Sequence, residues 1–208
     1  MIISRRHRYI FFPIPKTGTH SVRQALREHM GDQDLEQVGL FVHKRFPFQE
    51  TAHIPHGHLS VAEIRPAVGE EVFGSYLKFA FVRNPFDRFV SYCAFRSRAT
   101  NQFEIAPVPF MKHILREERP LGHVHYLPQH TFLTDGEGRM AMDFVGKTET
   151  MQADYDAICA RLGFPSRVLD RVNGSSHRPY QEYYDQDLIG WVSELYQKDL
   201  ELFGYTFE

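Results

Sequence analysis

A lysine and several hydroxyl side chains surround a glycine near the start of the chain, in Pro15-Lys16-Thr17-Gly18-Thr19-His20-Ser21. An apolar run over residues 9–14 precedes this segment and an amphipathic stretch over residues 21–30 follows it, which predicts a turn between a strand and a helix. The first N–H groups of a helix have no partner inside the helix, and the helix dipole favours negative charge there. With the lysine charge added, the segment predicts a phosphate-binding loop.

The order of residues in this segment differs from the P-loop of ATP-binding and GTP-binding proteins, in which the lysine directly follows a glycine. Here Lys16 comes before Gly18, and no glycine stands four or five residues upstream of the lysine. The lysine is therefore expected to approach a phosphate from the strand end of the turn. A strand, a turn and a helix with one lysine and one glycine also occur without a ligand, so a purely structural turn is the alternative.

A second combination of this kind is Arg83-Asn84-Pro85-Phe86-Asp87-Arg88-Phe89-Val90-Ser91. Arg83 ends the most apolar stretch of the chain, and the proline after it is typical of the first turn of a helix. A guanidinium and a hydroxyl two turns later can share one phosphate through charge-assisted hydrogen bonds. The alternative is that Arg83 pairs with Asp87 or with a carbonyl oxygen. Two anion sites suggest a nucleotide with phosphates at both ends of its nucleoside.

Two histidines flank a glycine in His56-Gly57-His58, within a segment of extended character. Side chains two residues apart on an extended backbone project to the same face. Because imidazole titrates near neutral pH, a histidine here suits a general base. The alternatives are solvated loop histidines, or a zinc site completed by His43 and His53, for which no cysteine or acidic residue lies close by in sequence.

The composition is that of an ordinary globular protein, with 42% hydrophobic residues and a net charge of −2 over 208 residues. The length predicts one domain, residues 1–208. The small negative charge argues against a broadly basic nucleic-acid binder. Cys93 and Cys159 lie in apolar patterns and are expected to be buried free thiols, which fits a reducing compartment. We find no signal peptide and no apolar run long enough to span a membrane, so the sequence predicts a soluble, cytoplasmic protein.

Strands that alternate with helices predict an α/β fold with a P-loop-like parallel sheet and helices on both faces. In such sheets ligands bind beyond the carboxyl ends of the strands, where both Lys16 and Arg83 fall. The expected strands are residues 9–14, 76–83 and 143–147, and the expected helices are residues 21–30, a short one from Ser60, 85–97, 110–118, 151–162 and a last one that Asp185 caps and Gly204 ends.

These motifs resemble those of the PAPS-dependent sulfotransferases. The segment at residues 15–21 is similar to their 5′-phosphosulfate loop, and the segment from Arg83 is similar to their 3′-phosphate motif. His56-Gly57-His58 resembles the His-Gly-His segment of the carbohydrate O-sulfotransferase branch, which includes heparan sulfate 2-O-sulfotransferase. Later family segments resemble Val145-Gly146-Lys147-Thr148-Glu149 and Ser176-His177-Arg178.

The resemblance implies sulfuryl transfer from 3′-phosphoadenosine 5′-phosphosulfate (PAPS) to a hydroxyl, with a carbohydrate as the acceptor and without a metal. It assigns Lys16 to the leaving group and the 5′-phosphate to the loop residues Thr17, Gly18, Thr19, His20 and Ser21. It assigns the 3′-phosphate to Arg83 and Ser91, with Arg178 on a loop that reaches a phosphate. His58 is the implied base, supported by His56.

Two departures from the family pattern concern the acceptor more than the donor. His20 stands where relatives often have a small hydroxyl residue, and the chain is short for the acceptor-binding insertions of larger relatives. An ATP-dependent small-molecule kinase with an atypical P-loop is an alternative function. A nucleotide-binding or glycan-binding module without turnover is another. The acceptor, the sulfated position and the oligomeric state do not follow from the sequence.

Overall fold

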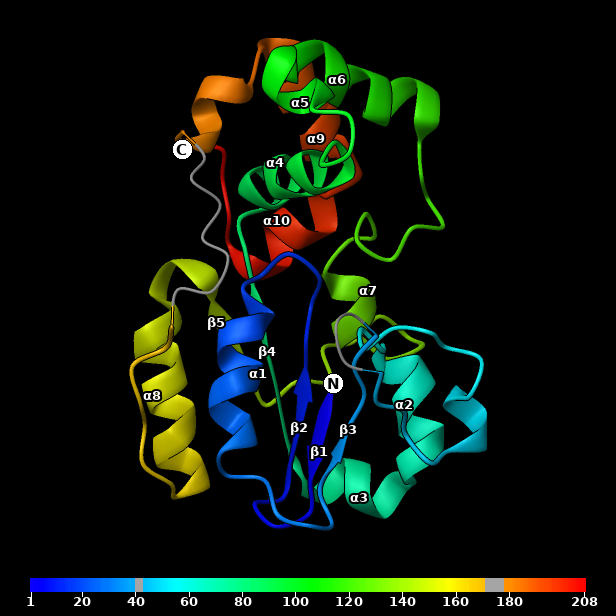
Figure 1. The fold of residues 1–208 in the computed structure, drawn as a ribbon, viewed down its shortest axis with the longest axis vertical. Coiled ribbons are helices and arrows are strands. Elements are labelled where there is room, and N and C mark those ends of the chain that lie inside the picture. Colours follow the sequence, from blue (N-terminus) through cyan, green and yellow to red (C-terminus); the bar gives the residue numbers. More distant parts are fainter. Residues whose placement is uncertain (40–42, 171–177) are drawn as a thin grey trace. The chain divides into compact units, whose positions relative to one another are not determined.

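The computed structural model covers residues 1–208 and describes residues 1–39, 43–170 and 178–208 (Figure 1). The chain forms two compact units. The first comprises residues 1–82 and 131–172, and the second comprises residues 83–130 and 173–208. A single sulfotransferase domain over residues 1–208 remains a prediction.

The first unit contains a five-stranded sheet with the strand order β3-β1-β2-β4-β5. Strands β2, β4 and β5 run parallel, whereas β1 pairs antiparallel with both β2 and β3. The expected α/β fold is thus confirmed, with a parallel sheet extended at one edge by two antiparallel strands. The strands are β1 (Ile2–Ser4), β2 (Tyr9–Phe12), β3 (Leu35–Glu36), β4 (Leu77–Val82) and β5 (Phe144–Lys147).

The sequence analysis missed the two antiparallel strands, β1 and β3, because each is too short to show an alternation of apolar and polar residues. β1 has only three residues, followed by an arginine-rich turn, and β3 has only two. Both are held by pairing with a neighbour, since Ile2 lies opposite Phe11 on one side and opposite Glu36 on the other. Local periodicity does not report pairing of this kind.

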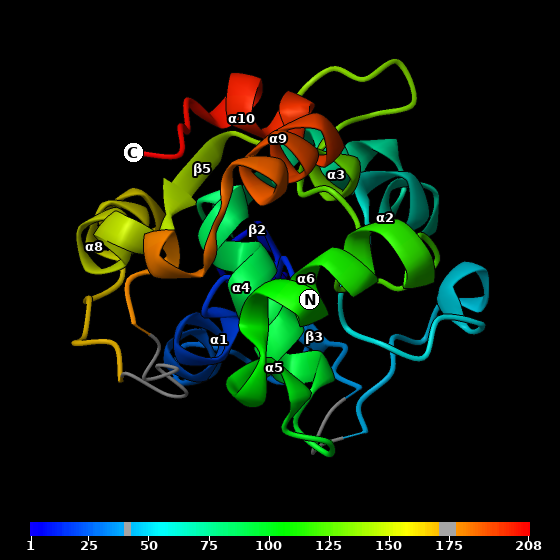
Figure 2. The ribbon, with the colours of Figure 1, turned by 90° about the horizontal axis from the view of Figure 1, so that it is seen from above.

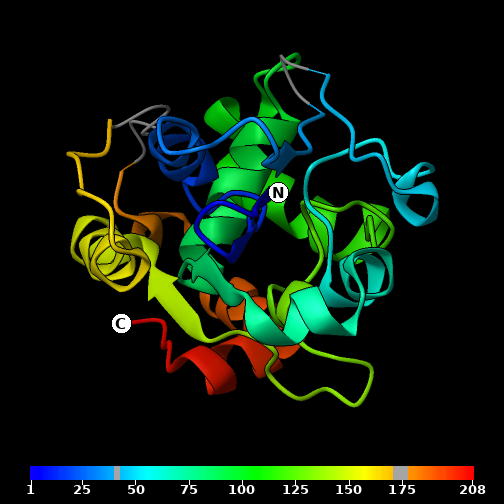
Figure 3. The same cartoon turned by 90° about the horizontal axis from the view of Figure 1, so that it is seen from below.

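Helices cover both faces of the sheet within the first unit (Figures 1 and 3). Alternate strand residues such as Tyr9, Phe11, Phe79 and Phe81 pack with apolar side chains of α1 and α8 in one buried cluster. Residues of the opposite alternation, including Phe12, are also fully buried. The helices of this unit include α1 (Thr19–Arg27), α2 (Val61–Val68), α3 (Glu70–Ser75) and α8 (Met151–Leu162).

Side-chain caps fix several helix starts at the residues that the sequence indicated. The Ser60 hydroxyl accepts a bond from the Glu63 N–H, and the Glu63 carboxylate accepts one from the Ser60 N–H, which forms a capping box. Asn84 caps α4 by accepting from the Phe86 N–H at 3.0 Å. Asp185 likewise accepts from the Leu188 N–H at 3.0 Å, which confirms the cap predicted there.

The second unit is helical (Figure 2), and its buried aromatic side chains form a core of their own. The last predicted helix is divided at Tyr196, whose buried ring lies in this core and whose hydroxyl donates to the Tyr126 carbonyl at 2.8 Å. Cys93 lies in this core and Cys159 in that of the first unit, both as buried free thiols. The helices are α4 (Pro85–Arg96), α5 (Gln102–Ile105), α6 (Pro107–His113) with a π-helical turn (Ile114–Glu118), α9 (Gln186–Leu195) and α10 (Gln197–Phe203), and α7 (His130–Leu133) begins at the unit boundary.

None of the helices in the described parts of the chain is both long enough and apolar enough to cross a membrane.

A buried carboxylate ties α1 to the edge of the sheet. The Glu36 side chain is 1% exposed, and its oxygens lie 2.8 Å from Arg27 Nη2, 2.9 Å from Lys44 Nζ and 3.7 Å from Arg23 Nε. Burial disfavours the charged carboxylate, but the hydrogen bonds from Arg27 and Lys44 outweigh it and lower the pKa of Glu36. A carboxylate with a lowered pKa stabilises the fold above its unfolded pKa and loses that contribution as the pH falls.

We expect Glu36→Gln to lower the free energy of unfolding by about 3 kcal/mol near neutral pH, because the buried Arg23 loses its counter-charge and the partly exposed Arg27 and Lys44 lose a partner. The difference from the wild type should shrink as the pH falls below about 4.3, the usual pKa of a glutamate in an unfolded chain, and should vanish below the lower pKa of folded Glu36. Denaturant unfolding at several pH values measures both effects. Glu70→Gln is the control, since its exposed pair with Arg65 should contribute far less. Equal losses in the two variants would contradict this account.

Candidate active site

The predicted phosphate loop leaves β2 and turns sharply into α1. Lys16 and Gly18 both have a φ of 69°, in the left-handed region. Such a conformation is costly for a lysine and free of that cost for a glycine, so the surrounding contacts must hold it. One of them is the Thr17 hydroxyl, which is fully buried and donates to the Ile14 carbonyl at 3.0 Å.

The start of α1 has the features of an anion-binding helix terminus. Gly18 is its N-cap residue, and in the described parts of the chain no side chain caps the helix. Its first N–H groups therefore depend on partners other than a cap, as helix starts at phosphate sites do. Thr19 and Ser21 lie in this first turn and are largely buried. The helix begins two residues earlier than the sequence indicated, because Gly18 forms its cap.

His20 lies in the same turn and is half-buried. Burial lowers its pKa, and the positive charges of Arg23, Arg27 and Lys16 lower it further. A neutral imidazole is therefore favoured at this position. The departure from the family pattern at His20 thus adds a polar, uncharged ring to the loop.

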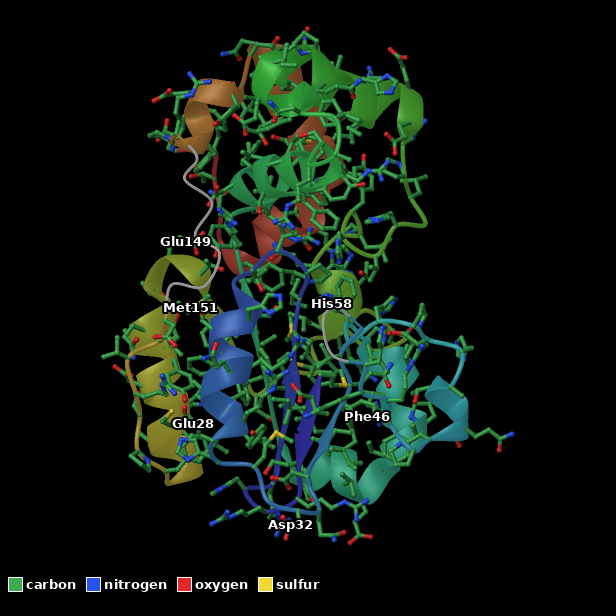
Figure 4. All side chains as sticks on the ribbon, in the orientation of Figure 1. Glu28, Asp32, Phe46, His58, Glu149 and Met151 are labelled. Atoms are coloured by element: carbon green, nitrogen blue, oxygen red, sulfur yellow. The ribbon has the colours of Figure 1, made fainter. Side chains whose placement is uncertain are left out.

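Two contacts connect the loop to the end of β5 and the start of α8. A Cβ atom on Gly18 would lie 2.7 Å from Cε of Met151, the end of a flexible side chain at the start of α8 (Figure 4), so the two elements are close there. The Thr148 hydroxyl donates to the Val82 carbonyl at 2.9 Å and lies 3.5 Å from the Thr17 carbonyl. Thr148 belongs to the later family-like segment, which the fold therefore brings beside the phosphate loop.

His58 is anchored immediately before the phosphate loop. Its Nδ1 lies 2.6 Å from the Pro13 carbonyl oxygen, and Figure 4 shows the side chain at the carboxyl end of β2. A carbonyl only accepts hydrogen bonds, so Nδ1 carries the proton. In the neutral ring Nε2 then holds the lone pair, which is the tautomer that a general base at Nε2 requires.

His56 lies beside His58, with 6.2 Å between the ring centroids. Its ring is half-buried, and its Nδ1 has no hydrogen-bond partner among the described residues. Burial lowers the pKa of His56, with Glu63 opposing the shift. In residues 1–39, 43–170 and 178–208, no three His, Cys, Asp or Glu side chains are grouped as ligands of a metal ion would be.

The predicted 3′-phosphate residues lie at the start of the second unit. Arg83 Nε donates to the Asp87 carboxylate at 2.7 Å, so the pairing named above as an alternative does occur. The bond at Nε helps to orient the guanidinium plane, and an oriented guanidinium fork is what binds a phosphate. Ser91 is largely buried two turns into α4. Binding of the 3′-phosphate by Arg83 and Ser91 stays a prediction.

Two residues that support Arg83 were missed by the sequence analysis. The buried carboxamide of Gln129 accepts from the Arg83 N–H and donates to its carbonyl, both at 2.9 Å. Asp199 is fully buried and accepts from the main-chain N–H groups of Gln129 and His130 and from the His130 ring. Arg83, Gln129 and Asp199 lie far apart in the chain, so no local sequence pattern predicts that they interact.

Arg178 is an exposed residue in the second unit. It pairs with Glu182 at 3.4 Å, and its guanidinium lies 5.0 Å from the centre of the Tyr183 ring. The predicted loop at residues 175–177 lies outside the described residues. The phosphate contact of Arg178 therefore stays a prediction.

Comparison with known proteins tests the resemblance on which these assignments depend. The sequence profile of the sulfotransferase family matches residues 1–206. The chain belongs to the sulfotransferase family. The chain is also similar to an uncharacterized protein of Archaeoglobus fulgidus, with 26% identity over 119 residues, which are 57% of this chain and 94% of that protein. No solved structure matches the chain.

In this sulfotransferase the glycine between the two histidines has a steric reason. A Cβ atom on Gly57 would lie 2.4 Å from the carbonyl oxygen of Gln37 and 3.2 Å from Cα of Val38. Main-chain atoms cannot move aside as the end of a flexible side chain can. The His-Gly-His segment therefore depends on a close approach of two backbones.

We expect Gly57→Ala to lower the free energy of unfolding by about 2 kcal/mol, because the added methyl group forces the two backbones apart. Thermal or denaturant unfolding checks the value. Gly74→Ala is the matched control, because a Cβ atom there meets nothing within 4 Å. A Gly57→Ala protein as stable as the control would show that the two segments can separate without cost.

Proposed function

We propose that this sulfotransferase transfers the sulfuryl group of PAPS to a hydroxyl of a carbohydrate acceptor, with His58 as the general base. The observation that carries the proposal is the 2.6 Å bond from His58 Nδ1 to the Pro13 carbonyl. A histidine with its proton on Nδ1, next to the turn that we propose holds the sulfuryl donor, supports this role.

The donor's 5′ end is proposed to bind the turn from Lys16 to Ser21. The N–H groups of the first turn of α1 and the threonine hydroxyls suit phosphate oxygens, and Lys16 would neutralise the bridging oxygen of the leaving group. Charge stabilisation at that oxygen matters because in-line transfer depends mainly on positioning and electrostatics. The left-handed lysine supports this role, since strained residues are held where function needs them.

The donor's 3′-phosphate is proposed to bind Arg83 and Ser91, with Arg178 as a further cation. Asp87 would fix the plane of the Arg83 guanidinium, and Gln129 would fix its main chain. Each charge-assisted hydrogen bond is worth about 1.5–3 kcal/mol. Such bonds suffice to distinguish PAPS from a nucleotide that lacks the 3′-phosphate.

Transfer then requires one proton to leave the acceptor. As the acceptor oxygen bonds to sulfur, its proton passes to Nε2 of His58, and the bond from sulfur to the donor's bridging oxygen breaks. Adenosine 3′,5′-bisphosphate leaves with the electron pair of that bond. A positioned histidine contributes about 10²-fold to 10⁴-fold to such a step. His56, whose ring lies next to His58, would support the base from a position where a neutral imidazole is favoured.

A carbohydrate acceptor is supported by the His-Gly-His segment. That segment resembles the carbohydrate O-sulfotransferase branch, and the structure brings its two rings together at the carboxyl end of β2.

Transfer of labelled sulfate from PAPS to a panel of acceptors, followed by mass spectrometry, tests the proposal directly. We expect sulfated carbohydrate with the wild type and none with Lys16→Ala. Calorimetry should show binding of adenosine 3′,5′-bisphosphate. Binding of ATP-magnesium without binding of the bisphosphate would favour a kinase, and donor binding without transfer to any acceptor would favour a module that lacks turnover.

We expect His58→Ala to lower kcat by about 10²-fold or more while the affinity for adenosine 3′,5′-bisphosphate stays within about twofold. The loss follows from removal of the base, which does not contact the bisphosphate. Steady-state kinetics and calorimetry measure the two quantities. His53→Ala, an exposed histidine nearby, should leave both unchanged. An unchanged kcat in His58→Ala would remove His58 as the base.

We expect Arg83→Ala to weaken binding of adenosine 3′,5′-bisphosphate by about tenfold or more, with little change for adenosine 5′-monophosphate. The difference between the two ligands isolates the 3′-phosphate. Calorimetry with both nucleotides measures it, and Arg98→Ala, an exposed arginine of the same unit, is the control. Equal weakening for both ligands would argue that Arg83 acts on the fold and not on the 3′-phosphate.

A further inference from the structure

Gln37 is a buried side chain that connects three separate segments of the first unit. It is 1% exposed. Its Nε2 donates to the Ile54 carbonyl at 3.1 Å and to the His56 carbonyl at 2.8 Å, and its Oε1 accepts from the Phe46 N–H at 3.0 Å. All hydrogen-bonding groups of the carboxamide are thus engaged with main-chain atoms. The bond to His56 places this side chain two residues from the proposed base.

The backbones of residues 37–39 and 55–57 also cross in direct contact, at a glycine on each side. A Cβ atom on Gly39 would lie 2.5 Å from the Pro55 carbonyl oxygen and 2.9 Å from Cα of His56. The corresponding atom on Gly57 would meet Gln37, as described above. Arg45 adds a hydrogen bond to the Ile54 carbonyl. The Gln37 carboxamide and the two glycines therefore hold residues 54–57, which lead to His58, against residues 37–39.

Contacts at the ring and along the main chain before it fix the position of His58, and one of them is the bond of 2.7 Å from the Met1 amino group to the Gly57 carbonyl. The Pro13 carbonyl holds Nδ1 of the ring, and Gln37 holds the carbonyl of His56 in the main chain that leads to the ring. If the main chain were released, the ring could keep its bond to Pro13 only by tilting, and Nε2 would move. Displacements of about 1 Å at a reacting group can cost about 10²-fold in rate.

We propose that Gln37 is the positioning residue of the catalytic histidine, holding the main chain at His56 so that Nε2 of His58 points toward the acceptor hydroxyl. This inference rests on the proposed function, in which His58 is the base. Gln37 acts through the main chain and touches neither reactant. Its removal is therefore expected to change the rate of transfer and not the binding of the donor.

The first test is Gln37→Met, which keeps nearly the same volume and removes every hydrogen bond of the carboxamide. We expect kcat to fall about tenfold or more, while the affinity for adenosine 3′,5′-bisphosphate stays within about twofold. The matched control is Gln152→Met. The Gln152 carboxamide also bridges main-chain groups, those of Arg167 and Leu169, and should leave kcat unchanged when removed.

A double-mutant cycle separates positioning from a general loss of structure. In a His58→Ala background, Gln37→Met should lower the residual activity by less than about twofold, because the base that it positions is gone. A tenfold loss in both backgrounds would overturn the inference, since Gln37 would then act independently of His58. If His58→Ala leaves kcat unchanged, the proposed function fails instead. If His58→Ala is impaired and Gln37→Met is not, this inference alone fails.

A second measurement covers the case in which Gln37→Met does not fold. Gln37→Glu keeps the oxygen that accepts from Phe46 and replaces the donor to the two carbonyls. In histidine-labelled protein, ¹⁵N NMR reports which ring nitrogen of His58 carries the proton. We expect a wild-type signal of the Nδ1–H tautomer and a mixture of tautomers in Gln37→Glu, together with a lower kcat. A wild-type signal and a wild-type kcat in this variant would overturn the inference.

Discussion

The parallel pairing of β2 with β4 is the constraint on which the rest of the site depends. Phe12 lies opposite Ala80 near the carboxyl ends of these strands, and β5 continues the same direction beside β4. The loops that follow parallel strands therefore leave the sheet at one edge. The phosphate loop and the Thr148 segment meet there, and the Thr148 hydroxyl connects the ends of β4 and β5. A ligand at this edge faces main-chain groups that the sheet has already positioned.

Main-chain carbonyl oxygens position the polar side chains in the first unit. His58 binds the Pro13 carbonyl, Thr17 binds the Ile14 carbonyl, and Gln37 binds the carbonyl of His56. Each of these hydrogen bonds fixes a main-chain carbonyl group as well as a side chain, so the main chain near it has little freedom to move. This arrangement suits the proposed in-line sulfuryl transfer, which would gain most from fixed geometry. In the second unit, the Gln129 carboxamide plays the same part for Arg83.

Several elements could be predicted because their signals are local. The capping box at Ser60 and Glu63 requires only residues three positions apart, and the continuous apolar run that forms β4 is typical of a strand covered on both faces. The two antiparallel strands were missed because β3 has only two residues and depends on its partner β1. The supporting roles of Gln129 and Asp199 were missed for the same reason, since each partner lies far away in the chain.

The sequence by itself determined the family, the α/β class and the residue types of the candidate site, because these depend on motifs in which neighbouring residues act together. Lys16 before Gly18, and His56 and His58 around a glycine, are patterns of this kind. Only the tertiary structure decided which atoms hold the histidines. The bond from His58 to Pro13 spans 45 residues, and that from Gln37 to His56 spans 19. Such contacts form only in the folded chain. Burial there excludes water, so a side-chain N–H group binds a main-chain carbonyl instead.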